Sequence, residues 1–209
     1  MNFKTITSSG GRKNFPKIIQ EVEELMAQLS VSEQWIDAMG CLMQLPGVAL
    51  VSAMTILSAV GDIQRFPDSK KLAGYAGLGT RIRSSGTRFY SGKITKQGRS
   101  ELRHILIEVA WAAVQSSPLW RQRYQKIAQR RGSQKAIVAI ARRILVTVWH
   151  VWKKKEVYRD TTIEAIQRKY TRWAYTHRLA RSNGYTAKQF TELMLSNIDC
   201  TALTKHIAS

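Results

Sequence analysis

The amino-acid sequence predicts an all-α or mainly α fold, because apolar residues recur at helical spacing over most of the chain. Hydrophobic residues make up 44% of the 209 residues, which suffices for one substantial core or two small ones. We expect a coiled-coil-like helix, a helix-hairpin-helix, a basic loop rich in Gly and Ser, and then a bundle of longer helices. The predicted parts are a leader with the first helix at 1–41, a central domain at 42–158 and a polar helical appendix at 159–209.

The first predicted helix follows a leader, residues 1–13, that we expect to be frayed. Asn14 can cap this helix and Pro16 can occupy its first turn. The stripe that follows predicts either a short coiled coil between two chains or a helix packed inside one domain. Its apolar members alternate four-residue and three-residue spacings, with Ser32 in the one slot that is not apolar: Ile18, Val22, Leu25, Leu29, Ile36, Met39 and Met43.

A tight turn is predicted where Leu45-Pro46-Gly47-Val48 interrupts the helical pattern, which resumes from Val51 to Val60. The glycine turn and the N-terminus of the second helix can offer backbone N–H groups to a phosphate. Gly47 is therefore a candidate nucleic-acid contact, although a plain turn between two helices fits the same residues.

The rest of the chain predicts a short helix at 69–78, a basic loop at 79–98 and a series of longer helices. These longer helices are expected at about 99–116, 119–131, 134–155 and 161–180, with a weaker pattern at 186–197. Within 134–155, Arg142 and Arg143 are expected to stay in solvent. The buried face of that segment is predicted to consist of Ile137, Ile140, Ala141, Ile144, Val148 and Val151.

The positive charge is large and unevenly placed. The chain has 33 Lys and Arg residues against 14 Asp and Glu residues, a formal net charge of +19. Residues 1–60 carry a net charge of −1, and residues 61–209 carry +20. Such an excess predicts a polyanionic partner, and its position predicts a dedicated binding region after residue 60.

Cysteine usage and hydropathy predict a cytoplasmic, nucleoid-associated protein with no membrane partner. Cys41 and Cys200 are far apart and lack the paired spacing of a zinc site or a disulfide framework. No apolar run approaches the roughly 18 residues of a membrane span, and residues 1–13 have no signal-peptide core.

The densest basic stretch runs from Arg81 to Arg103 and contains seven basic residues and one acid, Glu101. This charge predicts a groove that follows a phosphate backbone. Within it, Ser85 precedes Gly86, so that a phosphodiester could approach the serine hydroxyl closely, as a phosphoryl-transfer serine requires. Serine before glycine is also ordinary turn chemistry, and spacing alone leaves both interpretations open. The candidate phosphate contacts are Arg81, Arg83, Arg88, Lys93, Lys96, Arg99 and Arg103.

Several motifs between about Leu42 and Trp120 together resemble the C-terminal transposase domain of the insertion-sequence one-hundred-ten / one-hundred-sixteen family. Studied members of that family are guided by a bridge RNA. The chain has Gly79-Thr80 where the family usually continues to a proline. The motifs are Leu45–Val48, Arg65-Phe66, Leu72–Leu78, Ser84–Gly86, Gly92–Gly98 and Leu102-Arg103.

The resemblance implies a recombinase whose serine forms a transient covalent link to a DNA phosphate. By motif position that serine is Ser85, with Ser84 as the close alternative and Ser91 a distant third. The family also uses an RNase-H-like domain with four acidic metal ligands, which precedes the coiled coil, whereas about fifteen residues precede it here. We therefore expect a fragment that is inactive alone, with Mg²⁺ held only by the missing domain.

The remaining polar residues add no metal site, because Asp62, Asp68, Glu101 and Glu108 are scattered and fit helix-terminal charges or ion-pair partners. His104 could act as a base toward Ser85, but a solvated or capping histidine is the simpler interpretation. The expected partners are DNA, a structured guide RNA, and further copies of the chain or a full-length transposase. The alternatives are a non-catalytic nucleic-acid-binding module, or regulator of a full-length transposase, and a protein that binds cellular RNA without specificity.

Overall fold

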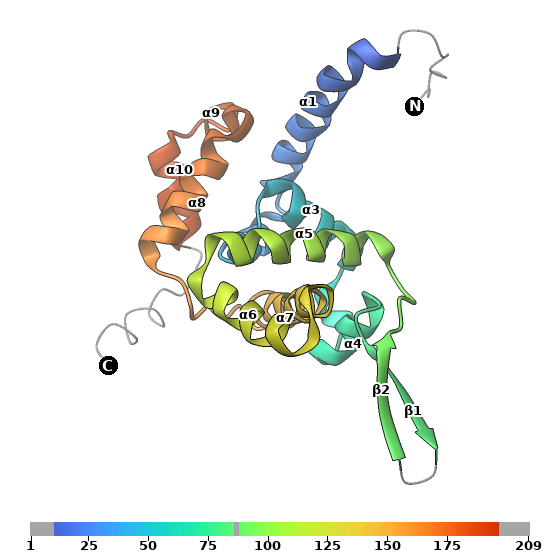
Figure 1. Cartoon of the computed structure of the whole chain (residues 1–209). Coiled ribbons are helices and arrows are strands. Elements are labelled where there is room, and N and C mark those ends of the chain that lie inside the picture. Colours follow the sequence, from blue (N-terminus) through green and yellow to red (C-terminus); the bar gives the residue numbers. More distant parts are fainter. Residues whose placement is uncertain (1–10, 86–87, 197–209) are drawn as a thin grey trace, which may run out of the picture.

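A computed structural model describes residues 11–85 and 88–196, and in this range the protein is mainly helical (Figure 1). Side chains are described from Phe15 to Gly79 and from Ile94 to Ser196. The elements are α1 Gly11–Ser30, α2 Ile36–Met43, α3 Leu50–Val60, α4 Ser69–Tyr75, β1 Thr80–Ser85, β2 Arg88–Ile94, α5 Ser100–Ser116, α6 Pro118–Arg131, α7 Ser133–Lys153, α8 Ile163–Tyr175, α9 Leu179–Ser182 and α10 Ala187–Ser196, with 3₁₀ turns at Ile63–Arg65 and Thr176–Arg178.

The predicted mainly α class is confirmed, and the long helices α5, α6 and α7 begin and end within two residues of the predicted bounds. The helix predicted at 161–180 is shorter, because α8 ends at Tyr175 and a 3₁₀ turn and α9 follow it. The stretch at 79–98 differs, because it was predicted to be a loop and instead contains β1 and β2, paired antiparallel. β-Branched and aromatic residues on both arms, Ile82, Phe89, Tyr90 and Ile94, account for the strands, since such residues favour extended backbone.

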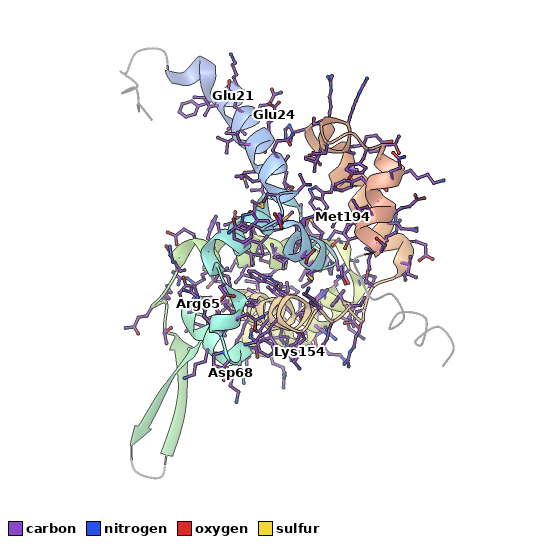
Figure 2. The ribbon with its side chains drawn as sticks, turned by 180° about the vertical axis from the view of Figure 1, so that it is seen from behind. Glu21, Glu24, Arg65, Asp68, Lys154 and Met194 are labelled. Atoms are coloured by element: carbon purple, nitrogen blue, oxygen red, sulfur yellow. The ribbon has the colours of Figure 1, made fainter. Side chains whose placement is uncertain are left out.

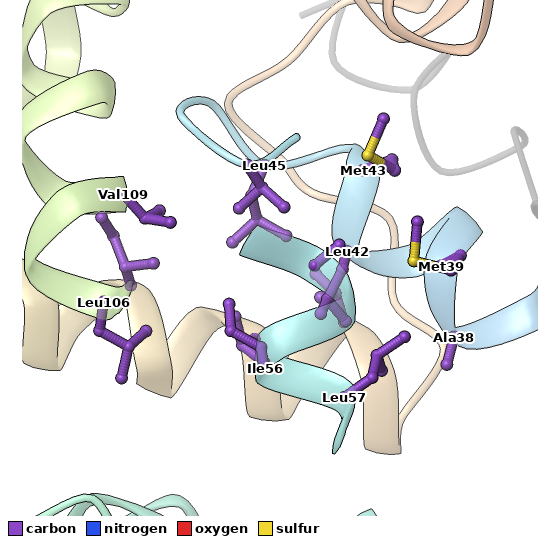
Figure 3. Packing of buried hydrophobic residues seen from close by; sticks show 14 of the residues in the cluster. Ala38, Met39, Leu42, Met43, Leu45, Ile56, Leu57, Leu106 and Val109 are labelled. Atoms are coloured by element: carbon purple, nitrogen blue, oxygen red, sulfur yellow. The ribbon is translucent and has the colours of Figure 1, made fainter. Parts of the chain in front are cut away.

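One hydrophobic core joins most of the helices. Helix α7 packs against α2, α4, α5 and α6, and its predicted apolar face is buried from Ile137 to Val151. Figure 3 shows the neighbouring layer, in which Leu42 of α2 meets Ile56 and Leu57 of α3. Leu106 and Val109 of α5 close the same cluster. We call α2 to α7, without the hairpin, the helical body.

The N-terminal apolar stripe is divided between two helices, whereas the spacing predicted one. Helix α1 ends at Ser30, and α2 begins at Ile36. Two serine hydroxyls bond backbone carbonyls at the break: Ser30 Oγ donates to Ala27 O at 2.6 Å, and Ser32 Oγ donates to Leu29 O at 2.7 Å. Met39 and Met43 are consequently buried in the core, while the stripe on α1 stays exposed.

The C-terminal helices pack onto α2 and the end of α1 through buried hydrogen bonds. Tyr170 Oη donates to Gly40 O at 2.7 Å, and Trp173 Nε1 donates to Ser30 Oγ at 3.0 Å. The division expected near residue 159 stays a prediction, but the described residues on its two sides share one hydrophobic core. In the part of the chain that the structure describes, no helix is both long and apolar enough to cross a membrane.

Lys169 reaches from α8 into this contact, where its ammonium donates a hydrogen bond to Leu45 O in the turn between α2 and α3. Burial lowers the pKa of Lys169 to about 7, and the positive charge of Arg172 adds to the effect. A lysine in the unfolded chain releases its proton near pH 10.5. Between these values the unfolded chain therefore holds more protons than the folded protein, and stability increases with pH.

We expect Lys169→Met to remove this part of the pH dependence. The wild type should gain up to about 1.4 kcal/mol of unfolding free energy per pH unit between pH 7.5 and 9.5, relative to the variant. Urea unfolding at several pH values measures the difference. Lys188→Met, at an exposed position of α10, is the matched control and should keep the wild-type slope. Equal slopes for wild type and Lys169→Met would contradict the expectation.

Candidate nucleic-acid interface

The β1–β2 hairpin projects from the helical body, on the opposite side from α1 (Figure 1). Its register pairs Ser85 with Arg88, Ser84 with Phe89 and Arg83 with Tyr90. Both candidate serines therefore lie at the end of β1 that is remote from the body. The side chains of 80–93 lie outside the described residues, and with them the predicted contacts of Arg81, Arg83, Arg88 and Lys93.

The base of the hairpin is closed by backbone contacts that need two glycines. Gly77 and Gly98 both have positive φ, and each faces backbone of the other arm. A Cβ on Gly77 would lie 2.7 Å from Gln97 O, and one on Gly98 would overlap Tyr75 O. Hydrogen bonds from Lys96 N to Gly77 O, 3.2 Å, and from Thr95 N to Gly79 O, 2.9 Å, join the arms. The hairpin therefore leaves the body from a fixed base.

Tyr75 connects this base to the helical body. Its hydroxyl donates to Ala59 O at 3.0 Å and accepts from Arg99 Nε at 3.0 Å. The guanidinium of Arg65 lies 4.7 Å from the centre of the Tyr75 ring and 4.8 Å from that of Phe66. Figure 2 shows Arg65 on the side of the body from which the hairpin leaves. Tyr75 is thus flanked by two exposed arginines, Arg65 and Arg99.

The two arginines also change the acidity of Tyr75. Partial desolvation raises the pKa of the phenol, but hydrogen bonding to Arg99 and Arg65, together with their positive charges, outweighs it. The pKa of Tyr75 therefore lies below its usual value. The hydrogen bond with Tyr75, together with the charge of Tyr75, raises the pKa of Arg99. This cluster is a local concentration of positive charge that favours an anion.

Three of the candidate phosphate contacts, Lys96, Arg99 and Arg103, have described side chains, and they differ in their protein neighbours. Arg103 Nη1 donates to Lys96 O at 3.2 Å and to Ala76 O at 3.4 Å, so this guanidinium supports the base of the hairpin. Lys96 is exposed and has a left-handed backbone, φ 55°. None of the ion pairs among the described residues involves Lys96, Arg99 or Arg103. Their phosphate contacts stay a prediction, with Arg103 held in part by the protein itself.

Gly47 lies in the tight turn between α2 and α3, as the sequence predicted, and it packs against α5. Its φ is +79°, and a Cβ there would lie 2.5 Å from Val109 O and 2.7 Å from Ala113 N. The glycine therefore permits close approach of the turn to the α5 backbone. The role of Gly47 in binding phosphate stays a prediction, whereas its packing role is visible.

The scattered carboxylates have the structural roles that the sequence suggested. Asp62 accepts from Gln64 N and Asp68 from Lys71 N, both at 2.8 Å, at the starts of two helical turns. Exposed His104 lies 3.7 Å from Glu108. Across 11–85 and 88–196, no group of three or more His, Cys, Asp or Glu side chains could hold a metal ion. These residues do not fit a Mg²⁺ site.

Sequence reasoning passed over Arg65 and Tyr75 as site residues. Each occurs in a motif that carried the family resemblance, Arg65-Phe66 and Leu72–Leu78, but neither lies within the basic stretch at 81–103. The sequence feature that could have identified them is an arginine next to an aromatic residue, Arg65-Phe66, followed by a second aromatic residue, Tyr75, in a glycine-rich segment. Tyr75 and Arg99 are 24 residues apart in the sequence, and they meet because the hairpin between them returns the chain to the helical body.

Comparison with known proteins shows that the middle of the chain is similar to one family. Residues 39–125 match the family model described as "Transposase IS116/IS110/IS902 family". This match includes the α2–α3 turn, the Tyr75 cluster and the whole hairpin. Residues 39–125 are thus similar to the transposase domain of that family.

Proteins similar to this chain come from several bacteria. The transposase for insertion sequence element IS1111A of Coxiella burnetii is 32% identical over 55% of this chain and 33% of its own length. The insertion element IS110 uncharacterized 43.6 kDa protein of Streptomyces coelicolor is 33% identical over 41% of this chain and 21% of its own. The insertion element IS900 uncharacterized 42 kDa protein of Mycobacterium paratuberculosis is 28% identical over 59% and 32%. The matched segments thus span a third or less of these relatives.

Proposed function

We propose that this chain binds DNA as the transposase domain of an insertion-sequence recombinase, with Ser85 as the nucleophile of phosphoryl transfer and Ser84 as the alternative. The supporting observation is the projecting basic hairpin, which has these serines at its remote end and the cationic residues Arg65, Lys96 and Arg99 at its base. A protruding, positively charged ribbon suits insertion along a phosphate backbone. A structured guide RNA presents the same phosphates and is proposed as a second partner.

The proposed chemistry exchanges one phosphodiester for another. The serine Oγ forms a bond to a DNA phosphorus, the bond from that phosphorus to one deoxyribose oxygen breaks, and this oxygen leaves as a hydroxyl with the serine proton. A deoxyribose hydroxyl of the recombining strand then attacks the phosphoserine link, and the serine recovers its proton. The number of phosphate ester bonds is conserved, so the exchange requires no nucleotide cofactor.

The metal-dependent part of the reaction is assigned to a separate acidic RNase-H-like domain. The described residues hold no carboxylate cluster, so Mg²⁺ would be bound by that domain. We infer that the hairpin carries its serines outward to meet that domain and the DNA together. The cations at the base, Arg65, Lys96 and Arg99, would then hold the flanking phosphates.

DNA binding should depend steeply on salt, because each Lys or Arg contact with a phosphate releases a counterion. The triple variant Arg81→Gln, Arg83→Gln, Arg88→Gln should lower the slope of log affinity against log salt by about three. Fluorescence anisotropy with a labelled DNA duplex between 50 and 300 mM salt measures both quantities. A salt-independent wild type, or an unchanged slope in the variant, would count against the proposed interface.

A triple variant on the C-terminal helices controls for the loss of three positive charges. Arg168, Arg181 and Lys188 are exposed there, and their replacement by Gln removes the same three charges. This variant should keep the wild-type slope if the hairpin is the contact. Equal losses in both variants would mean that binding follows net charge alone.

Ser85→Ala should abolish a covalent link between protein and DNA when a family RNase-H-like domain is supplied in trans. The measurement is the labelled adduct that survives denaturing electrophoresis. Wild type and Ser84→Ala should form it, and Ser85→Ala should fall to background. The reverse pattern would assign the chemistry to Ser84, and an adduct that survives both substitutions would exclude both serines.

A non-catalytic binding module, or a regulator of a full-length transposase, is the second candidate. The observation in its favour is the lack of an acidic cluster among the described residues. Such a module would bind DNA with the same salt dependence, and strand exchange by a full-length partner would be indifferent to Ser85→Ala. The adduct experiment therefore distinguishes the two candidates.

Self-association is proposed for α1, either between copies of this chain or with a full-length transposase. Helix α1 projects from the helical body (Figure 1), and six of its large apolar side chains are 44% to 64% exposed. An exposed stripe of this length is more stable when a second helix covers it. Among the described residues, these side chains are Phe15, Ile18, Ile19, Val22, Leu25 and Leu29.

Leu25→Glu should dissociate the assembly, because it places a charge at the most exposed apolar position of α1. Sedimentation equilibrium at micromolar concentration should give a dimer or larger species for the wild type and a monomer for the variant. Gln28→Glu adds the same charge at an exposed polar position of α1 and should remain associated. A monomeric wild type would overturn the proposal.

A further inference from the structure

A second basic surface lies on α6 and α7, outside the hairpin and largely outside the residues that match the family model. The segment from Pro118 to Lys153 contains nine Lys and Arg residues and no Asp or Glu. Within the described part of the chain, the only one of these nine in an ion pair is Arg123, whose Nη2 lies 3.6 Å from Asp160. Basic side chains without carboxylate partners leave a strong positive potential at the surface.

Three of these arginines line an open groove of about 480 Å³ between the two helices. Arg142 and Arg143 come from α7, and Arg123 comes from α6. Ala139 and Val146 also line the groove, and they lie one helical turn before and after the arginine pair. Their side chains are small and apolar. The groove is therefore shallow, with guanidinium groups at its walls.

The protein fixes one wall of this groove and leaves the other wall free. The guanidinium of Arg123 lies 5.0 Å from the centre of the Trp120 ring, which positions it. Trp120 is itself buried and donates from Nε1 to Tyr158 Oη at 2.8 Å. Among the described residues, no hydrogen bond or ion pair engages the side chain of Arg142 or Arg143. Their donors are available to a ligand.

Arg121, on the same helix as Arg123, is an arginine whose donors are used within the protein. Its guanidinium donates to Val114 O at 3.3 Å and to Gln115 O at 2.6 Å, at the end of α5. Those donors satisfy helix carbonyls and are not free for a ligand. Arg142 and Arg143 have no described partner of this kind, so a ligand or solvent has to balance their charge.

We infer that this α6–α7 groove is a second phosphate-binding surface, which holds the sugar-phosphate backbone of a nucleic-acid strand apart from the one at the hairpin. Arginine pairs suit phosphate oxygens because the planar guanidinium donates two parallel hydrogen bonds. The one aromatic ring of the groove is buried, so bases cannot stack on it. The groove therefore binds the backbone without reading sequence. This inference rests on the proposed nucleic-acid function and adds a separate site to it.

The test compares the salt dependence of binding for wild type and Arg142→Gln/Arg143→Gln, on duplex DNA and on duplex RNA of equal length and unrelated sequence. The groove variant should lower the slope of log affinity against log salt by about two. This loss should be equal for different sequences and should add to that of the hairpin variant. The probe on which it appears, DNA or RNA, identifies the strand that occupies the groove.

Two further variants complete the experiment. Arg181→Gln/Lys188→Gln removes two exposed charges elsewhere and should keep the wild-type slope. Asp160→Asn removes the carboxylate beside Arg123 and should tighten binding. Thermal denaturation checks that every variant is folded.

Each outcome separates the two proposals. If wild type binds and the hairpin variant loses its slope while the groove variant equals wild type on both probes, the groove is excluded and the proposed function stands. If wild type binds neither DNA nor RNA, both are overturned. A loss confined to the groove variant supports the groove and overturns the hairpin interface.

Discussion

The contact between Tyr75 and Arg99 is the interaction on which the placement of the hairpin depends. Tyr75 O accepts from Arg99 N, and its hydroxyl accepts from Arg99 Nε, each at 3.0 Å, so one residue of α4 binds both the backbone and the side chain that start α5. The hydroxyl also reaches Ala59 O in α3. The hairpin is inserted between these two residues. Its strands can therefore extend far from the core while their ends stay fixed.

Arginines in this protein serve two different purposes, and their neighbours distinguish them. Arg103 and Arg121 satisfy backbone carbonyls, and they hold the hairpin base and the end of α5. Arg65 and Arg123 are held against aromatic rings, which fixes the guanidinium but leaves its edge open. Arg142 and Arg143 have no described partner. A net charge of +19 is thus a sum of structural and available cations, and only the second kind can bind a polyanion.

Much of the fold could be predicted from helical spacing, and the errors have physical causes. The face of α7 from Ile137 to Val151 was predicted because its period is set by burial along one side. The hairpin at 80–94 was missed, because Gly and Ser suggested a loop and outweighed the β-branched and aromatic residues. The break at Ser30 was missed because the apolar spacing continues across it. The candidate serines and basic residues could be predicted because they lie close together in the sequence. The contact of Tyr75 with Arg99 could not, because it depends on the hairpin that brings the two residues together.

The acid-free segment from Pro118 to Lys153 has a consequence for how the protein behaves without its partner. Nine positive charges on two packed helices repel one another, and only Asp160 offsets any of them by a described ion pair. Folding has to overcome that repulsion whenever the surface is bare. Any polyanion that covers the helices removes the repulsion and favours the folded state, so occupancy and folding are linked by mass action. The melting temperature of this protein is thereby a gauge of how much of its basic surface is covered.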